Sequence, residues 1–183
     1  MFIFNSKILI LPGLGNSSEK HWQTAWESLY PSFIRVNQVD WETPVCEDWI
    51  KNIEEKIQEI GAENVILVGH SLACSTIGYW AEKYKTPIKG ALLVAPSDTE
   101  ADSYPSGTIG FTPMPTTPLP FKTITVTSDD DFYVSLERAA FFAQNWDSKL
   151  VVLNNSGHIN GDSNLGNWDF GLSLLKELDD SRN

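Results

Sequence analysis

Short apolar runs alternate along the chain with longer segments in which apolar residues recur with a helical period. Near-continuous apolar character is typical of strands buried on both faces, as in a parallel sheet that helices cover. Six such runs predict strands at residues 7–11, 34–39, 65–68, 91–95, 123–127 and 150–153. Their alternation with helices indicates an α/β fold with a doubly wound, mostly parallel six-stranded sheet flanked by helices.

Two segments show the helical period most clearly. The first ends at Gly61, a residue that commonly terminates helices, and its apolar positions are Trp49, Ile50, Ile53, Ile57 and Ile60. The second lies near the C-terminus and consists of Leu165, Trp168, Leu172, Leu175 and Leu178. Weaker patterns predict further helices at residues 21–30, 71–84 and 134–146.

The composition is that of an ordinary globular protein. Hydrophobic residues make up 42% and charged residues 20% of the 183 positions, so we expect a single domain over 1–183 with a frayed tail at 179–183. The net charge of −11 argues against nucleic acid and anionic membranes as partners, because both would repel the chain. Two cysteines cannot form a disulfide framework, and the N-terminal run lacks the basic start and cleavage site of a signal peptide. We therefore expect a cytoplasmic protein.

A serine lies at the point where the third predicted strand meets a helix. The apolar run Val65-Ile66-Leu67-Val68 is followed directly by Gly69-His70-Ser71-Leu72-Ala73. Such a turn is so tight that the residues two before and two after the serine can carry almost no side chain. In return the hydroxyl projects clear of its neighbours. This arrangement is typical of the nucleophile elbow of α/β-hydrolases and makes Ser71 the candidate nucleophile.

A serine hydroxyl needs a base to attack a carbonyl at neutral pH, and the base needs an acid to orient it. In α/β-hydrolases both follow the serine, with the acid before the histidine, on loops after later strands. His158 follows the sixth predicted strand. We expect the side chain of His70 to point away from the site of attack, and packing or helix capping explains His21. His158 is therefore the predicted base.

Three consecutive aspartates follow the fifth predicted strand, at the sheet edge where ligands bind in open parallel sheets. Only one of their carboxylates can face the imidazole, and a solvated turn must account for at least one of the others. We choose Asp131 over Asp129 and Asp130 because it lies deepest in the loop, directly before the next helix.

The oxyanion hole of such an enzyme needs two backbone N–H groups aimed at the developing negative charge. We expect one from Leu72, directly after the serine, and the other from Leu14 in the glycine-containing loop after the first strand. That loop also begins like a dinucleotide fingerprint, but it lacks the third glycine and a phosphate-binding lysine. No histidine or cysteine spacing indicates a metal site, so no metal and no other cofactor is predicted. We interpret Cys74 as a small buried hydrophobic residue.

Residues 104–121 hold five of the ten prolines and show neither the helical nor the strand period. Proline removes a backbone donor and fixes φ, so this segment is expected to be an ordered loop. We interpret it as a rim near the active site that carries Phe111, Met114 and Leu119 toward an apolar substrate pocket. A plain surface excursion between two strands is the alternative. An apolar rim predicts a preference for small to medium acyl groups.

Several blocks of sequence carry a resemblance to a known family. They are Leu11-Pro12-Gly13, His21-Trp22-Gln23, Gly69-His70-Ser71-Leu72, Ala95-Pro96-Ser97-Asp98, Asp131-Phe132-Tyr133-Val134 and Gly157-His158-Ile159-Asn160. In this order they resemble the small serine hydrolases of the YdeN and retinoblastoma-binding-protein-nine type. The resemblance implies a reduced α/β-hydrolase fold with a triad of Ser71, Asp131 and His158, although Ala73 and Phe132 depart from the family pattern.

The residues and the resemblance together predict an esterase-like serine hydrolase that acts on a small ester, thioester or amide. The expected partner is a small-molecule acyl substrate, and the oligomeric state stays open. Two alternatives share the same fold. One is a protein that keeps the hydrolase fold only to bind a ligand or partner, and the other is an acyltransferase with the same nucleophile.

Overall fold

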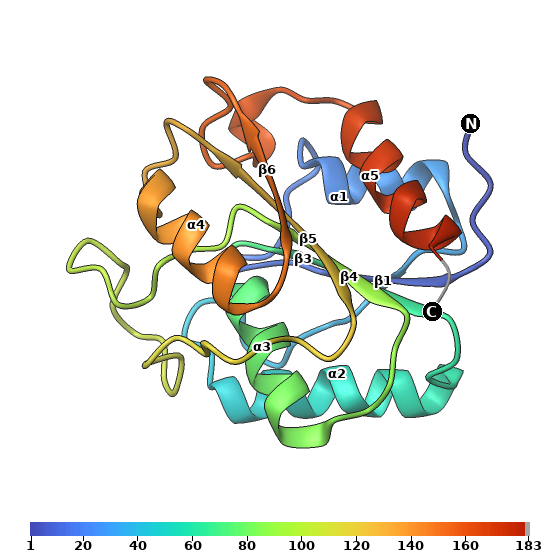
Figure 1. The fold of residues 1–183 in the computed structure, drawn as a ribbon, viewed down its shortest axis with the longest axis horizontal. Coiled ribbons are helices and arrows are strands. Elements are labelled where there is room, and N and C mark those ends of the chain that lie inside the picture. Colours follow the sequence, from blue (N-terminus) through green and yellow to red (C-terminus); the bar gives the residue numbers. More distant parts are fainter. Residues whose placement is uncertain (182–183) are drawn as a thin grey trace.

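The structure, a computed structural model, describes residues 1–181 of the chain. Its sheet contains six parallel strands in the order β2-β1-β3-β4-β5-β6 (Figure 1). The strands are β1 (Lys7–Leu11), β2 (Ile34–Arg35), β3 (Val65–His70), β4 (Gly90–Val94), β5 (Lys122–Ser128) and β6 (Lys149–Leu153). The helices are α1 (Trp22–Leu29), α2 (Cys46–Ile60), α3 (Leu72–Tyr84), α4 (Leu136–Asn145), α5 (Asp169–Asp180) and the short 3₁₀-helix η1 (Gly161–Ser163).

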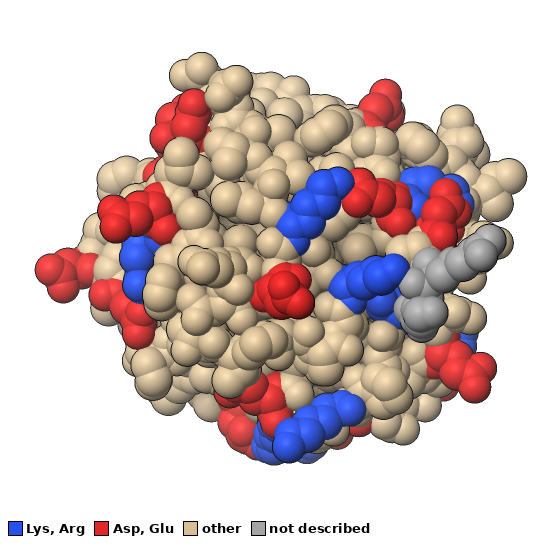
Figure 2. Space-filling model, viewed as in Figure 1, with Lys and Arg blue, Asp and Glu red and all other residues tan. Residues whose placement is uncertain are grey.

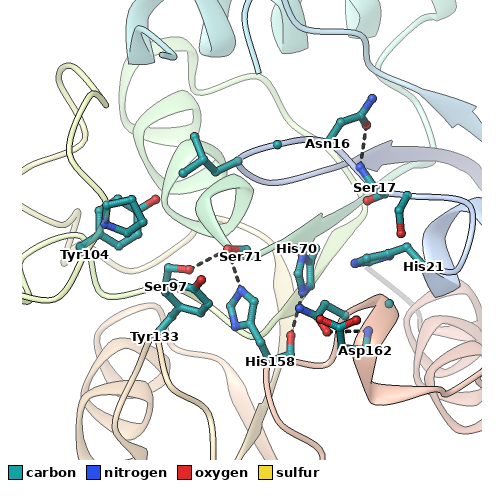
Figure 3. A pocket seen from close by; sticks show the side chains of 16 residues that line it. Asn16, Ser17, His21, His70, Ser71, Ser97, Tyr104, Tyr133, His158 and Asp162 are labelled. Carbon is teal, nitrogen blue, oxygen red and sulfur yellow. Dashed lines mark hydrogen bonds between the residues drawn. The ribbon is translucent and has the colours of Figure 1, made fainter. Parts of the chain in front are cut away.

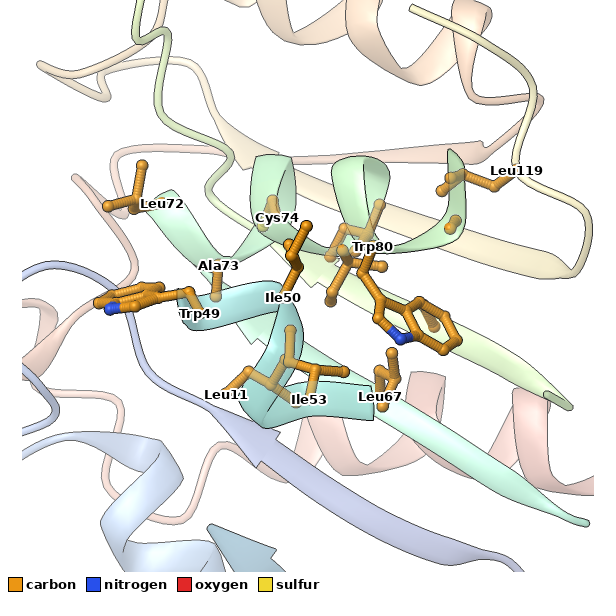
Figure 4. Close-up of a cluster of buried hydrophobic side chains, with 14 of the residues drawn as sticks. Leu11, Trp49, Ile50, Ile53, Leu67, Leu72, Ala73, Cys74, Trp80 and Leu119 are labelled. Atoms are coloured by element: carbon orange, nitrogen blue, oxygen red, sulfur yellow. The ribbon is translucent and has the colours of Figure 1, made fainter. Parts of the chain in front are cut away.

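Helices cover both faces of the sheet (Figure 1). Helices α2, α3 and α4 pack on one face, and α1 and α5 pack on the other. Alternate residues of β3 therefore enter different clusters, with Val65 and Leu67 on the α2–α3 side and Ile66 and Val68 on the α1–α5 side. Figure 4 shows part of the first cluster, where Leu67 lies among side chains of α2 and α3. Burial on both faces explains the almost continuous apolar character of these strands.

The second strand is shorter than the prediction of residues 34–39. It lies at the edge of the sheet, where Ile34 and Arg35 pair with β1, and the Val36 N–H donates to the Ile10 oxygen at 2.9 Å. The chain then leaves the sheet, and Val39 is exposed. An edge strand has a neighbour on one side only, so an apolar sequence alone does not extend its pairing.

The C-terminal segment is ordered further than expected. Residues 179 and 180 were predicted to fray, but they complete α5. The carboxylate of Asp179 is buried and accepts hydrogen bonds from the backbone N–H groups of Asn5 and Ser6, at 3.0 and 2.8 Å. The rest of the predicted tail, residues 182 and 183, lies outside the described residues.

Charged side chains of both signs are scattered over the face shown in Figure 2, with broad uncharged areas between them. Some charged side chains of the protein form ion pairs, such as Lys149 with Glu177 at 2.7 Å. Within residues 1–181, no helix combines the length and the apolar character that a membrane span requires.

Candidate active site

The turn between β3 and α3 holds Ser71 in a strained backbone conformation. Its φ of 58° and ψ of −122° lie outside the regions that residues other than glycine commonly occupy. Gly69 makes the turn possible, because a Cβ atom there would lie 2.7 Å from Ile77 Cδ1 and 3.3 Å from the carbonyl group of Ala73. Ala73 is itself buried, so the elbow forms although alanine replaces the usual second glycine.

The structure brings Ser71, His158 and Asp131 together at the carboxyl ends of the strands. His158 Nε2 lies 2.9 Å from Ser71 Oγ, and His158 Nδ1 lies 2.9 and 3.0 Å from the two carboxylate oxygens of Asp131. Figure 3 shows the imidazole directed at the serine. A carboxylate can only accept, so Nδ1 carries the proton and Nε2 is left free to accept the proton of Ser71. This is the geometry that general-base activation of a serine requires.

The three consecutive aspartates have different partners. Asp129 and Asp130 accept hydrogen bonds from backbone N–H groups of the loop after β6, at 2.8 and 2.7 Å. Asp130 also accepts a bond from Ser128 Oγ at 2.6 Å, and these hydrogen bonds lower the pKa of its carboxyl group. Only Asp131 faces His158, and its side chain is completely buried. The first two carboxylates therefore hold the histidine loop against β5, while the third meets the ring.

A second serine, which the sequence did not single out as a site residue, contacts Ser71. Ser97 Oγ lies 2.7 Å from Ser71 Oγ in the loop after β4 and is buried. When the single proton of Ser71 is donated to His158, the hydroxyl of Ser97 must be the donor in this second bond. The next residue, Asp98, forms a two-point ion pair with Arg138 of α4, at 2.6 and 3.0 Å, which fixes the loop. Sequence spacing gives no signal for such a contact.

Two backbone N–H groups lie close to the elbow. A Cβ atom on Gly13 would lie 2.8 Å from both the His70 carbonyl oxygen and Ser71 Cβ, and 3.3 Å from Leu72 N, so only glycine allows this approach. The following residue, Leu14, lines the same cavity as Ser71. Within residues 1–181, neither the Leu14 N–H nor the Leu72 N–H has a hydrogen-bond acceptor. Two unpaired donors beside a nucleophile can stabilise an oxyanion.

The other two histidines also line the cavity. His70 Nε2 lies 2.9 Å from the backbone oxygen of His158, to which it donates, so the expectation that His70 points away from the site was wrong. His21 caps α1 as predicted, with Nδ1 accepting from the Gln23 N–H at 3.1 Å. Burial is the main cause that lowers the pKa of both rings, and Arg35 contributes at His21, whose pKa falls to about 3. Both rings are therefore neutral at pH 7.

Ser71 and His158 open onto a cavity of about 490 Å³, formed by the loops that follow β1, β4, β5 and β6. Two tryptophans of α1 fasten the loop after β6. Trp22 Nε1 donates to the Ile159 oxygen at 2.7 Å, and Trp26 Nε1 donates to the Asn167 oxygen at 2.8 Å. The first helix thus holds the loop that carries the candidate base.

The residues expected to form an apolar pocket lie elsewhere. Phe111, Met114 and Leu119 are buried in the cluster between the sheet and helices α2, α3 and α4, and the described cavity wall does not include them. Trp146 Nε1 donates to the Pro115 oxygen at 2.9 Å and fixes the segment to the end of α4. The segment is an ordered loop, as predicted, but these side chains complete the core. The expected preference for small to medium acyl groups therefore has no basis in them.

The described residues offer no group of three or more histidine, cysteine, aspartate or glutamate side chains that could hold a metal ion. Cys74 is buried, with Sγ 3.4 Å from the Val94 oxygen, and burial raises the pKa of its thiol. It therefore stays protonated and packs as a small hydrophobic residue, as predicted.

A doubly wound parallel sheet, a strained serine after β3 and a histidine beside it define the class of serine hydrolases with a reduced α/β-hydrolase fold. The chain belongs to the serine hydrolase family, whose sequence model matches residues 8–177. Among curated proteins, no sequence is detectably similar.

Solved structures agree with this assignment. A YdeN-like hydrolase from Pectobacterium atrosepticum is 31% identical, with 94% of this chain and 90% of that chain covered and a TM-score of 0.82. The ydeN gene product of Bacillus subtilis is 20% identical over 95% and 98% of the two chains, with a TM-score of 0.72. An esterase from Thermogutta terrifontis shares the fold at 14% identity, 96% and 91% coverage and a TM-score of 0.69. The resemblance to YdeN-like hydrolases is thus confirmed.

Proposed function

We propose that the protein is an esterase-like acyl hydrolase with Ser71 as nucleophile, His158 as general base and acid, and Asp131 as the residue that orients the imidazole. The observation that carries the proposal is the unbroken series of hydrogen bonds from Asp131 through His158 to Ser71, each about 2.9 Å long. The unpaired amides of Leu14 and Leu72 beside it support the same chemistry. The substrate class is a small ester, thioester or amide.

The reaction proceeds in two halves. Ser71 Oγ attacks the carbonyl carbon while its proton passes to His158 Nε2, and the new oxyanion accepts hydrogen bonds from the Leu14 and Leu72 amides. The bond to the leaving group then breaks, and His158 returns the proton to that group. Water, deprotonated by His158, attacks the acyl-Ser71 ester. The bond between the acyl carbon and Ser71 Oγ breaks, the acid leaves, and His158 returns the proton to Ser71 Oγ.

Labelling with a fluorophosphonate probe tests this proposal directly, because the probe reacts only with an activated serine. We expect one adduct on Ser71 by mass spectrometry and none in Ser71→Ala or His158→Ala. A matched control is Ser148→Ala, which removes a hydroxyl paired with Thr125 at 2.8 Å outside the cavity and should label like the wild type.

Two results would separate the alternatives. A folded wild-type protein that takes up no probe would contradict the proposal and favour a binding protein. If the probe labels Ser71 but esters are turned over only when an alcohol or amine is added, the protein is an acyltransferase and not a hydrolase.

A further inference from the structure

The cavity beside Ser71 has two chemically different ends. At one end lie Tyr104, Pro105 and Tyr133, which we call the aromatic end. At the other lie Asn16, Ser17, Ser18, His21, Asn160 and Asp162, which we call the polar end. In Figure 3, Tyr104 lies to one side of Ser71, whereas Asn16, Ser17, His21 and Asp162 lie to the other. A substrate bound across Ser71 therefore meets a different environment on each side of its carbonyl group.

The polar end is built from two loops in contact. A Cβ atom on Gly161 would lie 3.0 Å from Ser18 Oγ, so the loop before α1 and the turn after β6 meet closely. Asn160 Oδ1 accepts from the Asp162 N–H at 3.0 Å, which directs the amide oxygen and leaves the NH₂ group as donor. Within residues 1–181, this NH₂ group, the Ser18 hydroxyl and the Asp162 carboxylate have no hydrogen-bond partner.

His21 adds a buried donor to the same end. Its Nδ1 accepts from a backbone N–H, so the proton of the neutral ring lies on Nε2. His21 is only 4% exposed, and Nε2 has no hydrogen-bond partner among the described residues. A buried donor of this kind is unfavourable unless an acceptor reaches it.

The charge of the polar end limits what can bind there. Asp162 is the single charged side chain among the described residues that line the cavity, and no lysine or arginine lines it. Arg35, which donates to Asn16 Oδ1, is already paired with the carboxylate of Glu27. A phosphate or carboxylate would therefore meet Asp162, and no described lysine or arginine lines the cavity to offset the repulsion. An ammonium group would meet Asp162 but could use neither the Asn160 NH₂ group nor the His21 N–H.

We propose that the polar end binds a neutral group that carries hydroxyls, such as a glycerol or sugar unit, so that the substrate is an ester joining such a group to an aromatic or short apolar one. Hydroxyls both donate and accept, and they can therefore pair with the Asp162 carboxylate and the Asn160 amide at once. This inference rests on the proposed esterase function and narrows its substrate class. It excludes thioesters of phosphorylated carriers.

Two series of esters test the inference. The first contains phenylacetate esters of 1-propanol, glycerol, glycerol 3-phosphate and choline, and the second contains benzyl esters of propanoic and glyceric acid. We expect the preference in the series that places its hydroxylated group at the polar end. In that series, kcat/KM for the dihydroxylated ester should exceed kcat/KM for its propyl or propanoyl counterpart about tenfold, as one or two hydrogen bonds allow. The phosphorylated and choline esters should fall below the glycerol ester.

The variant Asp162→Asn tests which residue is responsible. It should narrow the difference between the glycerol and glycerol-phosphate esters about tenfold, because it removes the repulsive charge and replaces one acceptor oxygen with an NH₂ donor. The matched control is Asp180→Asn, which makes the same charge change at the exposed end of α5 and should preserve the ratio.

The outcomes distinguish the inference from the proposed function. Turnover of the esters without any preference for hydroxyls, or with a preference for the phosphorylated or choline ester, would overturn the inference alone. If no ester is turned over and the fluorophosphonate probe fails to label Ser71, the proposed function fails instead.

Discussion

The carboxyl and amino ends of the strands use charged and polar groups in opposite ways. At the carboxyl ends of the strands, Ser71 and Ser97 are buried and line a cavity that no lysine or arginine of the described chain lines, and the buried Asp131 contacts His158. At the amino ends of the strands, cations lie close to hydrogen-bond acceptors. Lys89 Nζ donates to the backbone oxygen of Asp179 at 2.6 Å, and Lys149 pairs with Glu177 of α5. The carboxyl ends of the strands carry the candidate active site, and the polar groups at the amino ends hold the terminal segments in place.

Two aspartates show the difference most directly. Asp131 is buried against the ring of His158, which it orients in the proposed mechanism. Asp179 is equally buried, but its partners are the backbone N–H groups of Asn5 and Ser6 and the ammonium group of Lys176. Burial by itself raises the pKa of Asp179, and these hydrogen bonds outweigh it and lower the pKa to about 2. A change at the first should affect activity, and a change at the second should affect folding.

The largest effect is expected for Asp131→Asn. The amide can present an N–H to His158 Nδ1 and so favour the tautomer in which Nε2 carries the proton and cannot accept from Ser71. We expect kcat to fall roughly 10⁴-fold, with a melting temperature close to that of the wild type. Ester turnover and thermal unfolding of the same sample check this. A loss of less than tenfold would show that Asp131 is not the orienting acid.

The next effect is expected for Gly13→Ala. The new Cβ would lie 2.8 Å from the His70 oxygen and from Ser71 Cβ, so the loop must shift and take the Leu14 N–H with it. Loss of one oxyanion donor should lower kcat by about 10² to 10³. Gly15→Asn is the control, because no atom lies within 4 Å of a Cβ there and asparagine tolerates its φ of 74°. Equal losses in both variants would count against a specific role for Gly13.

A smaller effect is expected for Ser97→Ala, which removes the donor to Ser71 Oγ. The alkoxide character of Ser71 during attack is then less well stabilised, and we expect about a tenfold loss in kcat/KM, the value of one hydrogen bond to a charged oxygen. Ser97→Thr keeps the hydroxyl and should retain more activity than Ser97→Ala. The melting temperature of each variant shows whether a loss of activity comes from the missing hydrogen bond or from unfolding. If alanine is as active as the wild type, the bond contributes nothing to attack.

The smallest effect on activity, and a clear one on folding, is expected for Asp179→Asn. The folded-state pKa of Asp179 lies below the ordinary value of 3.8, so its stabilisation is present above that value and is lost as the pH falls toward about 2. We expect the free energy of unfolding of the variant to be about 1 to 2 kcal/mol lower than that of the wild type at pH 7, and the difference to be smaller near pH 2. Ester turnover should match the wild type. A deficit that is the same at both pH values would contradict the role of the carboxylate.

Much of the candidate site could be predicted from the sequence, because its residues directly follow the ends of strands and depend on neighbours close in the sequence. The elbow depends on Gly69 and Ala73, both within two residues of Ser71. The contacts of Ser97 and His70 could not be predicted, since they depend on how neighbouring strands align. The apolar side chains of residues 104–121 were assigned to a pocket because hydrophobicity alone does not distinguish a core position from a cavity wall. Asp179 escaped notice because its partners lie at the other end of the sequence.

The hydrogen bonds from Trp22 and Trp26 to the loop after β6 also concern the order of synthesis. The first helix is synthesised well before its acceptors at Ile159 and Asn167. A chain that is still being synthesised therefore contains Ser71 before it contains His158. Under the proposed mechanism, Ser71 becomes reactive only after the loop that follows β6 has been synthesised and has packed against the first helix.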